Sequence, residues 1–398
     1  MSKTNSDFFD KKTEWAVVKD ELLSAYLVPY LSKILSTRKP LIYIDGFAGK
    51  GRFADGAKGS PVIACELMQD ALNRTRVSNP LMKAFFIEKK HGEDLRLNLP
   101  KVPFAKVIDG DYTNSLKGLE DIGKNKNIFM YVDPYGVKHL NFNQFANISV
   151  KFDSAEILFN FNSFGFFRAA CRAYQIECNS IDEDYWLEEQ DPWTEPLLAK
   201  DSYKLTQIVG GDYWKEIVQK FKDGKIDGYE AEVEITKGLC NNLSQYYKYV
   251  LNIPVRLKSS NRPKYRMIHL SNHPDGCLLM YDNMQKRMQE LFDLQYESQL
   301  ILFDIDSENR VIDMSSYLSS FREHVLGHSE FVTPEKVIAE YVVDIDLSVP
   351  LADIYDVIGE MEKDGLIDVK RDPEYTLTKR KSTFLRSSSG KRIWLKSK

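Results

Sequence analysis

The sequence is short of the features that mark metal-ribbon, secreted and membrane-spanning proteins. Its five cysteines form no C-x-x-C pair, which argues against zinc ribbons and redox-active dithiols. No apolar run approaches 18 residues, and the first 15 residues contain no apolar signal-peptide core. An odd number of cysteines without such a leader suits a reducing compartment. We therefore expect a cytoplasmic protein that does not associate with membranes.

The six histidines show no spacing that indicates a metal site. His324 and His328 stand four residues apart and could share one face of a helix, but no acidic residue lies beside them at a fixed offset. We interpret this pair as chance and predict no bound metal ion.

Charge is distributed unevenly along the 398 residues. The net charge is −4, yet the stretch from Lys370 to the end holds ten Lys or Arg against two acids. This tail therefore carries +8 and leaves −12 for the rest of the chain. A hydrophobic content of 43% is enough for a sizeable core, and the length indicates two or three domains. The pattern favours a basic appendage on an acidic body.

The first 160 residues alternate between strand-like and helix-like segments. Apolar residues at helical spacing predict a helix over 14–35, and Ser60-Pro61 predicts the start of another that reaches about residue 72. We expect strands at 41–45, 83–88, 104–109, 127–133 and 155–161, with helices at 91–99, 115–122 and 141–149. This alternation predicts an α/β fold, a Rossmann-like doubly wound parallel sheet.

The remainder of the chain predicts further parts. Residues 171–225, rich in Asp, Glu, Trp and Tyr, are expected to form a helical insertion. A helix at 229–249, a strand at 267–272 and a helix at 274–291 would complete a first domain over 1–295. After a connector at 296–330, helices at 335–343 and 350–364 precede a basic β-hairpin, which predicts a winged-helix domain over 331–398.

A glycine-rich loop, DGFAGKG at 45–51, follows the strand at 41–45. Glycines let the backbone approach a ligand closely, because they lack Cβ and tolerate positive φ. A Walker A loop is excluded, because its lysine and hydroxyl are missing at the required positions. Residues 49–54 match the dinucleotide fingerprint G-x-G-x-x-A, but the acid and glycines that follow break the expected helix. An S-adenosylmethionine loop tolerates that break, and a purely structural turn stays as the alternative.

Acidic residues follow each of the next two strands. Glu88 ends the strand at 83–88, where a carboxylate can accept hydrogen bonds from both ribose hydroxyls. Asp109 and Asp111 follow the strand at 104–109, where an acid can meet the amino group of adenine. Ligands of open α/β sheets bind at the carboxyl ends of the strands, so these acids are expected to surround one nucleoside. We predict S-adenosylmethionine as the cofactor.

The turn Asp133-Pro134-Tyr135 after the strand at 127–133 is predicted to be catalytic. Methyl transfer to an exocyclic amine requires the nitrogen to be held with its lone pair facing the methyl group. A carboxylate and a nearby carbonyl can accept its two N–H bonds while an aromatic ring stacks on the base. Asp133 and Tyr135 supply the carboxylate and the ring. A structural proline turn is the alternative, and a site built around Asp111 or Asn160 is the other possibility.

The segments IDGFAGKGRF, KGSPVIACEL, FFIE, GDYTNSL and YVDPYG, in this order, resemble the bacterial three-Cys-motif partner proteins. The resemblance covers residues 11–295 and implies a class I methyltransferase-like fold. A wider resemblance is to bacterial large-ribosomal-subunit RNA adenine-N6 methyltransferases, whose Asp-Pro-Pro-Tyr turn has one proline more than this chain. Lys19 falls where that family places a cofactor-contacting lysine. The loop and the resemblance together indicate these cofactor-binding residues: Lys19, Asp45, Gly46, Phe47, Gly49, Gly51, Ser60, Glu88, Asp109 and Asp111.

Basic residues of the C-terminal hairpin flank a serine-glycine tip, as in a wing that reaches along phosphates, although a protein-binding hairpin is the alternative. Those predicted to contact nucleic acid are Lys379, Arg380, Lys381, Arg386, Lys391 and Arg392. We predict a methyltransferase that acts on an amine of a base in RNA or DNA, with adenine N6 as the favoured position. The alternative is a non-catalytic or protein-directed methyltransferase-like partner of a three-cysteine radical-type enzyme.

Overall fold

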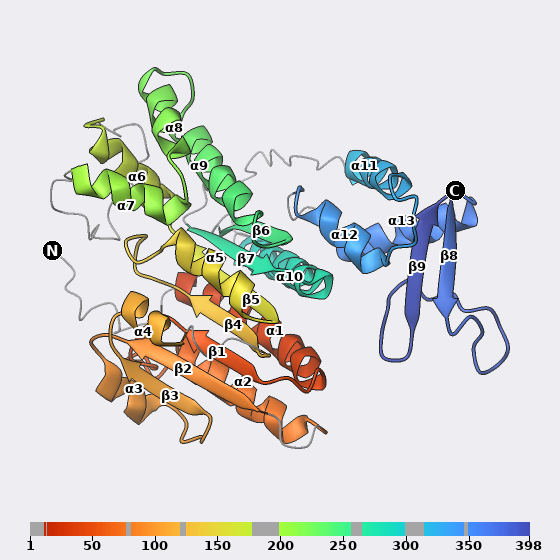
Figure 1. The fold of residues 1–398 in the computed structure, drawn as a ribbon, viewed down its shortest axis with the longest axis horizontal. Coiled ribbons are helices and arrows are strands. Elements are labelled where there is room, and N and C mark those ends of the chain that lie inside the picture. The colour runs from red at the N-terminus through yellow and green to blue at the C-terminus, as the bar shows by residue number, and fades with distance from the viewer. Residues whose placement is uncertain are drawn as a thin grey trace. The chain divides into compact units, whose positions relative to one another are not determined.

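A computed structural model describes residues 12, 14–76, 81–119, 125–176, 199–255, 265–298, 314–345 and 349–398. The chain forms two compact units, residues 1–272 and 273–398 (Figure 1). Parts of the predicted insertion (177–198), of the predicted connector (299–313) and of the helix at 115–122 lie outside the described residues. Among the residues that are described, no helix combines the length and the apolar character needed to cross a lipid bilayer.

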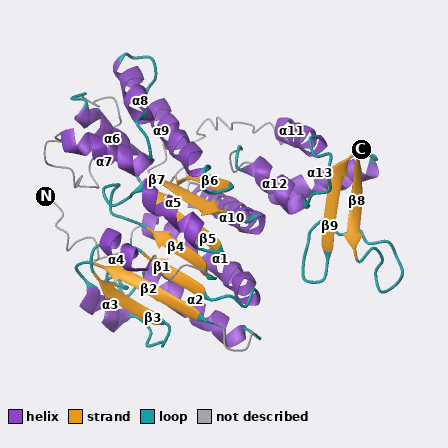
Figure 2. Ribbon diagram, viewed as in Figure 1, coloured by secondary structure: helices purple, strands orange, loops and turns teal. Residues whose placement is uncertain are grey.

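The first unit is built on a seven-stranded sheet (Figure 2). Its strand order is β3 (Ala105–Asp109), β2 (Met82–Glu88), β1 (Leu41–Asp45), β4 (Asn127–Val132), β5 (Ser154–Phe161), β7 (Tyr265–Ser271), β6 (Tyr249–Val255). β1 to β5 run parallel, whereas β7 is antiparallel to both of its neighbours. The predicted α/β doubly wound sheet is confirmed. Its order reverses between β1 and β4, the point at which ligands of such sheets bind.

Helices cover both faces of the sheet centre, so every residue of β1 and β4 is buried. On one face, Tyr43 of β1 stacks on Phe129 of β4, and Tyr26 and Tyr30 of α1 pack on the same Phe129 ring. Alternate residues such as Ile128 belong to the hydrophobic core of the other face, with residues of α5 and α6. The helices of this unit are α1 (Glu14–Ser36), α2 (Ser60–Arg74), α3 (Gly92–Asn98), α4 (Tyr112–Leu119), α5 (Phe142–Lys151), α6 (Ser163–Ala173), α7 (Ala199–Val209), α8 (Tyr213–Lys222) and α9 (Gly228–Leu243).

The predicted helix at 229–249 is wrong in its second part. α9 ends at Leu243, and a turn leads into β6, which the sequence interpretation missed. The Tyr247 hydroxyl donates to the carbonyl oxygen of Phe145 at 2.7 Å and fixes the turn on α5. β6 is the edge strand of the sheet and, among the described strands, pairs with β7 only. Sheets tolerate a proline such as Pro254 in an edge strand, because one side of that strand forms no ladder of hydrogen bonds. Tertiary contacts therefore override the helical periodicity.

The second unit contains four helices and one antiparallel strand pair among its described residues. Thr333 caps the third of these helices by accepting a hydrogen bond from the Lys336 N–H, and Pro334 follows it as the first helical residue. The first helix, assigned to the first domain from the sequence, belongs to this unit and packs against α12. The predicted domain limits 1–295 and 331–398 stay predictions. The elements are α10 (Pro274–Ser298), α11 (Met314–Leu326), α12 (Pro334–Val342), α13 (Leu351–Lys363), β8 (Ile367–Asp372) and β9 (Arg392–Ser397).

Candidate functional site

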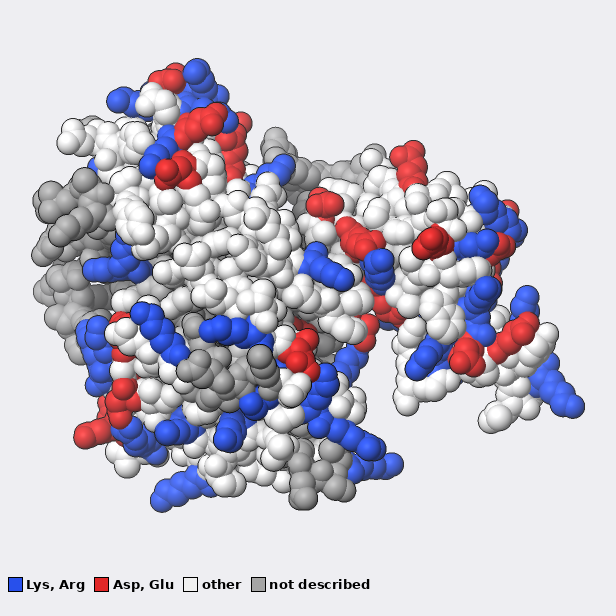
Figure 3. Space-filling model, in the orientation of Figure 1, with Lys and Arg blue, Asp and Glu red and all other residues white. Residues whose placement is uncertain are grey.

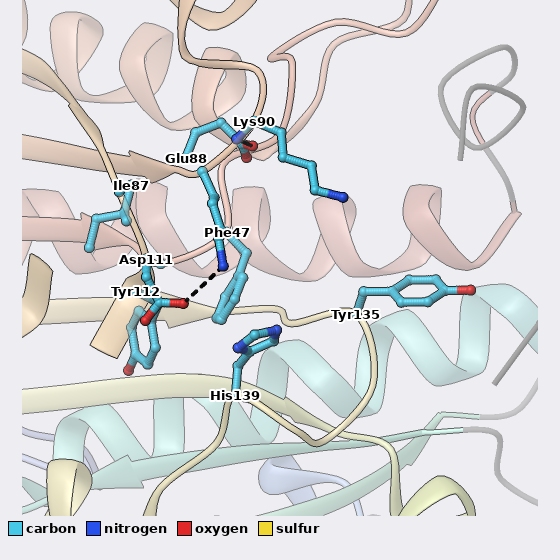
Figure 4. Close-up of a pocket in the computed structure, with 11 residues that line it drawn as sticks. Phe47, Ile87, Glu88, Lys90, Asp111, Tyr112, Tyr135 and His139 are labelled. Carbon is cyan, nitrogen blue, oxygen red and sulfur yellow. Dashed lines mark hydrogen bonds and ion pairs between the residues drawn. The ribbon is translucent and has the colours of Figure 1, made fainter. Parts of the chain in front are cut away.

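A cavity of about 210 Å³ lies at the carboxyl ends of β1, β2 and β3, beside the point where the strand order reverses. The ring of Phe47 lies between Tyr112 and His139, with ring centroids 4.9 and 5.8 Å away (Figure 4). Burial lowers the pKa of His139, so its imidazole is neutral at physiological pH. The walls are aromatic and the rim is charged. The lining residues are Gly46, Phe47, Ile87, Glu88, Lys89, Lys90, Gly110, Asp111, Tyr112, Tyr135 and His139.

Asp45 supports the glycine-rich loop from beneath. It ends β1 and is fully buried. One carboxylate oxygen accepts the Phe47 N–H at 3.1 Å, and the other accepts the Ser60 hydroxyl at 2.8 Å. Asp45 and Ser60 do not line the cavity. They join the start of the loop to the first residue of α2 and so determine the path of the backbone between them.

The buried Asp45 carboxyl predicts a pH dependence of stability. Desolvation raises its pKa to about 7, because it outweighs the hydrogen bonds from Ser60 and Phe47. The contribution of this group to the free energy of unfolding is fully present below its ordinary pKa of 3.8, and it is lost as the pH rises through about 7. We expect Asp45→Asn to remove roughly 2–4 kcal/mol of that loss. Asp20, whose pKa burial raises to about 6, acts in the same direction, so part of the loss remains.

Urea unfolding at about pH 4 and about pH 8 measures this difference. The free energy of unfolding of the wild type should fall between the two conditions by more than that of Asp45→Asn. An equal fall in both proteins would show that the Asp45 carboxyl is not the titrating group.

Glu88 is held rigidly at the end of β2. One carboxylate oxygen accepts the backbone N–H groups of Lys90 and His91 at 2.7 and 3.1 Å, and the other accepts the Gly49 N–H at 2.9 Å. Each carboxylate oxygen has two acceptor positions, so the oxygen that binds Gly49 retains one of them. Because Glu88 lines the cavity, this position is available to a hydroxyl donor placed there.

The loop glycines have the backbone conformations that the sequence predicts. Gly49 and Gly51 have φ values of 63° and 80°, in the left-handed region that favours glycine. The carbonyl oxygen of Gly51 accepts the Gly59 N–H at 2.9 Å, which closes the loop before α2 begins at Ser60. The predicted interruption between loop and helix is confirmed, so the helix N-terminus does not follow the glycines directly.

The two acids after β3 differ in environment. Asp109 is exposed, forms an ion pair with Arg96 that lowers its pKa, and is not among the cavity-lining residues. Asp111 lines the cavity, accepts the Thr113 N–H at 3.0 Å and lies 3.7 Å from the Lys89 ammonium (Figure 4). Asp111 is therefore the acid that can contact a bound molecule in this geometry.

Asp133 lies just beyond the end of β4 in a polar cluster. Its two carboxylate oxygens accept hydrogen bonds from the Lys19 ammonium at 2.6 and 2.9 Å, and the Asn160 side-chain amide donates at 2.9 Å. The amide oxygen of Asn160 is buried and has no hydrogen-bond partner in the described structure. Pro134 is buried, whereas the Tyr135 side chain is 47% exposed and lines the cavity.

Some of these contacts were not predictable from the sequence. Lys19 was expected at the cofactor, and here it contacts Asp133. Asn160 donates to Asp133, whereas Asn162, two residues later, caps α6 by accepting the Gly165 N–H at 2.8 Å. Tyr112, which follows Asp111 directly, could have been found from the strand-end rule, whereas nothing in the sequence around His139 indicated its position in the cavity.

The six basic residues of the C-terminal hairpin are all exposed, in the 373–391 connection between β8 and β9 and at the start of β9. The Arg386 guanidinium lies 4.2 Å from the centre of the Tyr355 ring, and the Lys391 ammonium 5.5 Å from that of Phe384. On the face shown in Figure 3, acidic and basic side chains are intermixed over this unit. On that face, acidic side chains therefore interrupt the positive charge of the unit.

No family model matches the chain, and none of the curated proteins matches its sequence. Among solved structures, the chain is similar to a plantazolicin methyltransferase in complex with SAH (13% identity, 65% of this chain and 87% of that chain, TM-score 0.30). It is also similar to human methyltransferase-like protein 13 in complex with SAH (9% identity, 75% of this chain and 99% of that chain, TM-score 0.32). A third similar structure is spermidine synthase from Thermotoga maritima (8% identity, 72% of each chain, TM-score 0.30). Such TM-scores are too low to establish a shared fold, so the fold assignment rests on the strand order of this chain.

Proposed function

We propose that the protein is an S-adenosylmethionine-dependent methyltransferase that acts on an amine of a nucleic-acid base. The observation that carries the proposal is the pairing of a nucleoside-sized cavity with Asp133 and Asn160 at neighbouring strand ends. The cavity accounts for the adenosine part of the cofactor, and the polar pair accounts for the amine.

The cavity suits an adenosine group. The Phe47 and Tyr112 rings and the Ile87 side chain offer apolar surface for a purine. Asp111 can accept a hydrogen bond from the exocyclic amine, and the remaining acceptor position of Glu88 can take a ribose hydroxyl. Both acids follow the strand ends at which nucleotide-binding sheets place these contacts.

The loop suits S-adenosylmethionine better than a dinucleotide. A pyrophosphate would need free backbone N–H groups and the N-terminus of the following helix. Here the Gly49 N–H donates to Glu88, and α2 begins nine residues after Gly51. The half-buried carboxylates of Glu88 and Asp133 at this sheet edge favour a ligand that carries positive charge. The sulfonium and ammonium groups of S-adenosylmethionine supply that charge.

Asp133 and Asn160 are suited to hold an amine. Two N–H bonds need two acceptors, and the Asp133 carboxylate lies beside the buried Asn160 amide oxygen that has no partner in the described structure. We propose that Lys19 moves from Asp133 to the carboxylate of the bound cofactor, which releases Asp133 for the amine. Tyr135, exposed at the cavity, would stack on the base.

Glu88 provides a direct test of the cofactor proposal. We expect Glu88→Gln to weaken S-adenosylmethionine binding by about 1–3 kcal/mol, because the amide keeps one acceptor oxygen but loses the charge and half of the acceptor positions. Isothermal titration calorimetry measures the change, and Asp109→Asn, at the end of β3 but outside the cavity lining, is the matched control. Wild-type affinity in Glu88→Gln would remove the carboxylate from the cofactor site.

The basic hairpin supports a nucleic-acid substrate. We propose that α12, α13 and the β8–β9 strand pair form a winged helix. Replacing Lys379, Arg380 and Lys381 by Ser should weaken nucleic-acid binding and lower the slope of log affinity against log salt by roughly 2–3. Each of these cations is exposed and so is free to meet a phosphate. The control replaces three exposed lysines of the first unit, Lys222, Lys225 and Lys237.

Fluorescence anisotropy with a labelled duplex and a labelled single strand measures both quantities for the two triple variants. A salt slope that is unchanged in the hairpin variant would favour a protein-binding hairpin instead. Such a result would support the alternative in which the protein is a partner of a three-cysteine radical-type enzyme.

The experiment that tests the function as a whole is mass spectrometry of nucleosides from cells with and without the gene, together with calorimetry of the purified chain. We expect one methylated base, with N6-methyladenine favoured, to disappear without the gene. Failure of the folded protein to bind either S-adenosylmethionine or its demethylated product would overturn the proposal. Cofactor binding without any change in nucleosides would favour the non-catalytic or protein-directed alternative.

A further inference from the structure

The second unit brings together three potential metal ligands that the sequence does not connect. His324 lies in the last turn of α11, His328 follows that helix, and Glu340 lies on α12. One ligand atom from each of the three side chains lies within 4.8 Å of the other two. All three side chains are partly buried, so they are screened from bulk water and yet reachable by an ion. We propose that His324, His328 and Glu340 bind one Zn²⁺ ion.

Hydrogen bonding prepares His324 to act as a ligand. Its Nε2 lies 3.1 Å from the carbonyl oxygen of Val337, and a carbonyl can only accept, so Nε2 carries the proton. In the neutral ring, Nδ1 then has the lone pair. Metal-binding histidines commonly donate their other ring N–H to a carbonyl in this way, which fixes the tautomer and the ring orientation. The Phe321 and Tyr341 rings pack on His324 and hold it in place.

Glu340 presents one oxygen to the histidines and the other to a lysine. Its Oε2 lies 3.8 Å from Nε2 of His328, whereas the Lys336 ammonium lies 3.7 Å from Oε1. Lys336 therefore does not occupy the oxygen that faces the proposed ion. Two imidazoles and a carboxylate form a ligand set that zinc accepts, with the fourth tetrahedral position left to water. The donor atoms must approach one another by up to about 1.5 Å to reach zinc bond lengths, which side-chain rotation can supply.

The proposed ion would join three elements of the second unit. It connects the end of α11 directly to α12, and the His328 carbonyl oxygen also accepts the Ser397 N–H of β9 at 2.7 Å. Bound Zn²⁺ should therefore raise the unfolding temperature of this unit, because the ion binds the folded arrangement and not the unfolded chain.

The test is zinc titration of the full chain, without an affinity tag and after treatment with a chelator, followed by calorimetry and thermal unfolding. We expect one Zn²⁺ per chain, at least about 100-fold weaker binding in His328→Ala, and a clear loss of affinity in Glu340→Gln, which preserves side-chain size. The control is Glu323→Gln, an exposed acid of α11 next to His324, with wild-type affinity. The proposal would be overturned if the wild type showed no saturable Zn²⁺ binding, or if His328→Ala and Glu340→Gln both bound Zn²⁺ with the affinity of the wild type.

Discussion

Asp133→Ala is expected to leave cofactor affinity intact and to lower the rate of methyl transfer by roughly 10²–10⁴-fold, the usual scale for a positioned proton-transfer group. The carboxylate lies at the end of the strand next to β1, beside Asn160, and would hold the attacking amine. Asp133 holds the Lys19 ammonium in this structure and competes for it with the carboxylate of the cofactor. The variant removes that competition, so binding of S-adenosylmethionine should not weaken.

Calorimetry with S-adenosylmethionine and transfer of a labelled methyl group to the nucleic acid from gene-deleted cells separate the two effects. Asp109→Ala is the control, because it removes an acid at another strand end that pairs with Arg96 and makes no contact with Lys19 or Asn160. Full methyl transfer by Asp133→Ala would assign the chemistry to another residue, with Asp111 and Asn160 as the next candidates. Parallel loss of cofactor binding and turnover would show that Asp133 mainly supports the cofactor site.

Gly51→Val is expected to weaken S-adenosylmethionine binding by at least about 100-fold, which corresponds to about 2.7 kcal/mol. At φ +80°, a side chain is strained, and a Cβ would lie 3.0 Å from Cδ1 of Leu95 and 3.3 Å from Cβ of Asn98. The loop must shift to relieve both contacts. That shift would move Gly49, whose N–H positions the Glu88 carboxylate.

Gly56→Ala is the matched control for backbone strain. Gly56 has φ +85° in the same loop, but an added Cβ meets nothing within 4 Å. It should therefore lower stability slightly and leave cofactor affinity near that of the wild type. Calorimetry gives the affinities, and thermal unfolding shows that both variants are folded. Equal losses of affinity in the two variants would mean that backbone strain, and not the contacts with Leu95 and Asn98, is responsible.

The alternation of strands and helices could be predicted because parallel strands buried on both faces are short apolar runs. β1 and β4 are such runs, and the glycines and acids after them are local signals. The prediction of a helix up to residue 249 was wrong because helical periodicity reports only on the local sequence. The Tyr247 hydroxyl contacts Phe145, about a hundred residues earlier in the chain, and such a contact leaves no periodicity in the sequence.

The sequence by itself determined which residues follow each strand, and hence that Glu88, Asp111 and Asp133 lie along one edge of the sheet. That follows from chain direction, because parallel strands present their carboxyl ends together. Tertiary structure alone decided what each of them contacts. It directs Asp109 to Arg96 and away from the cavity, and it places Lys19 on Asp133. In the second unit it brings Glu340 to His324 and His328. Such pairings depend on how separate helices and loops pack, and spacing along the chain does not encode them.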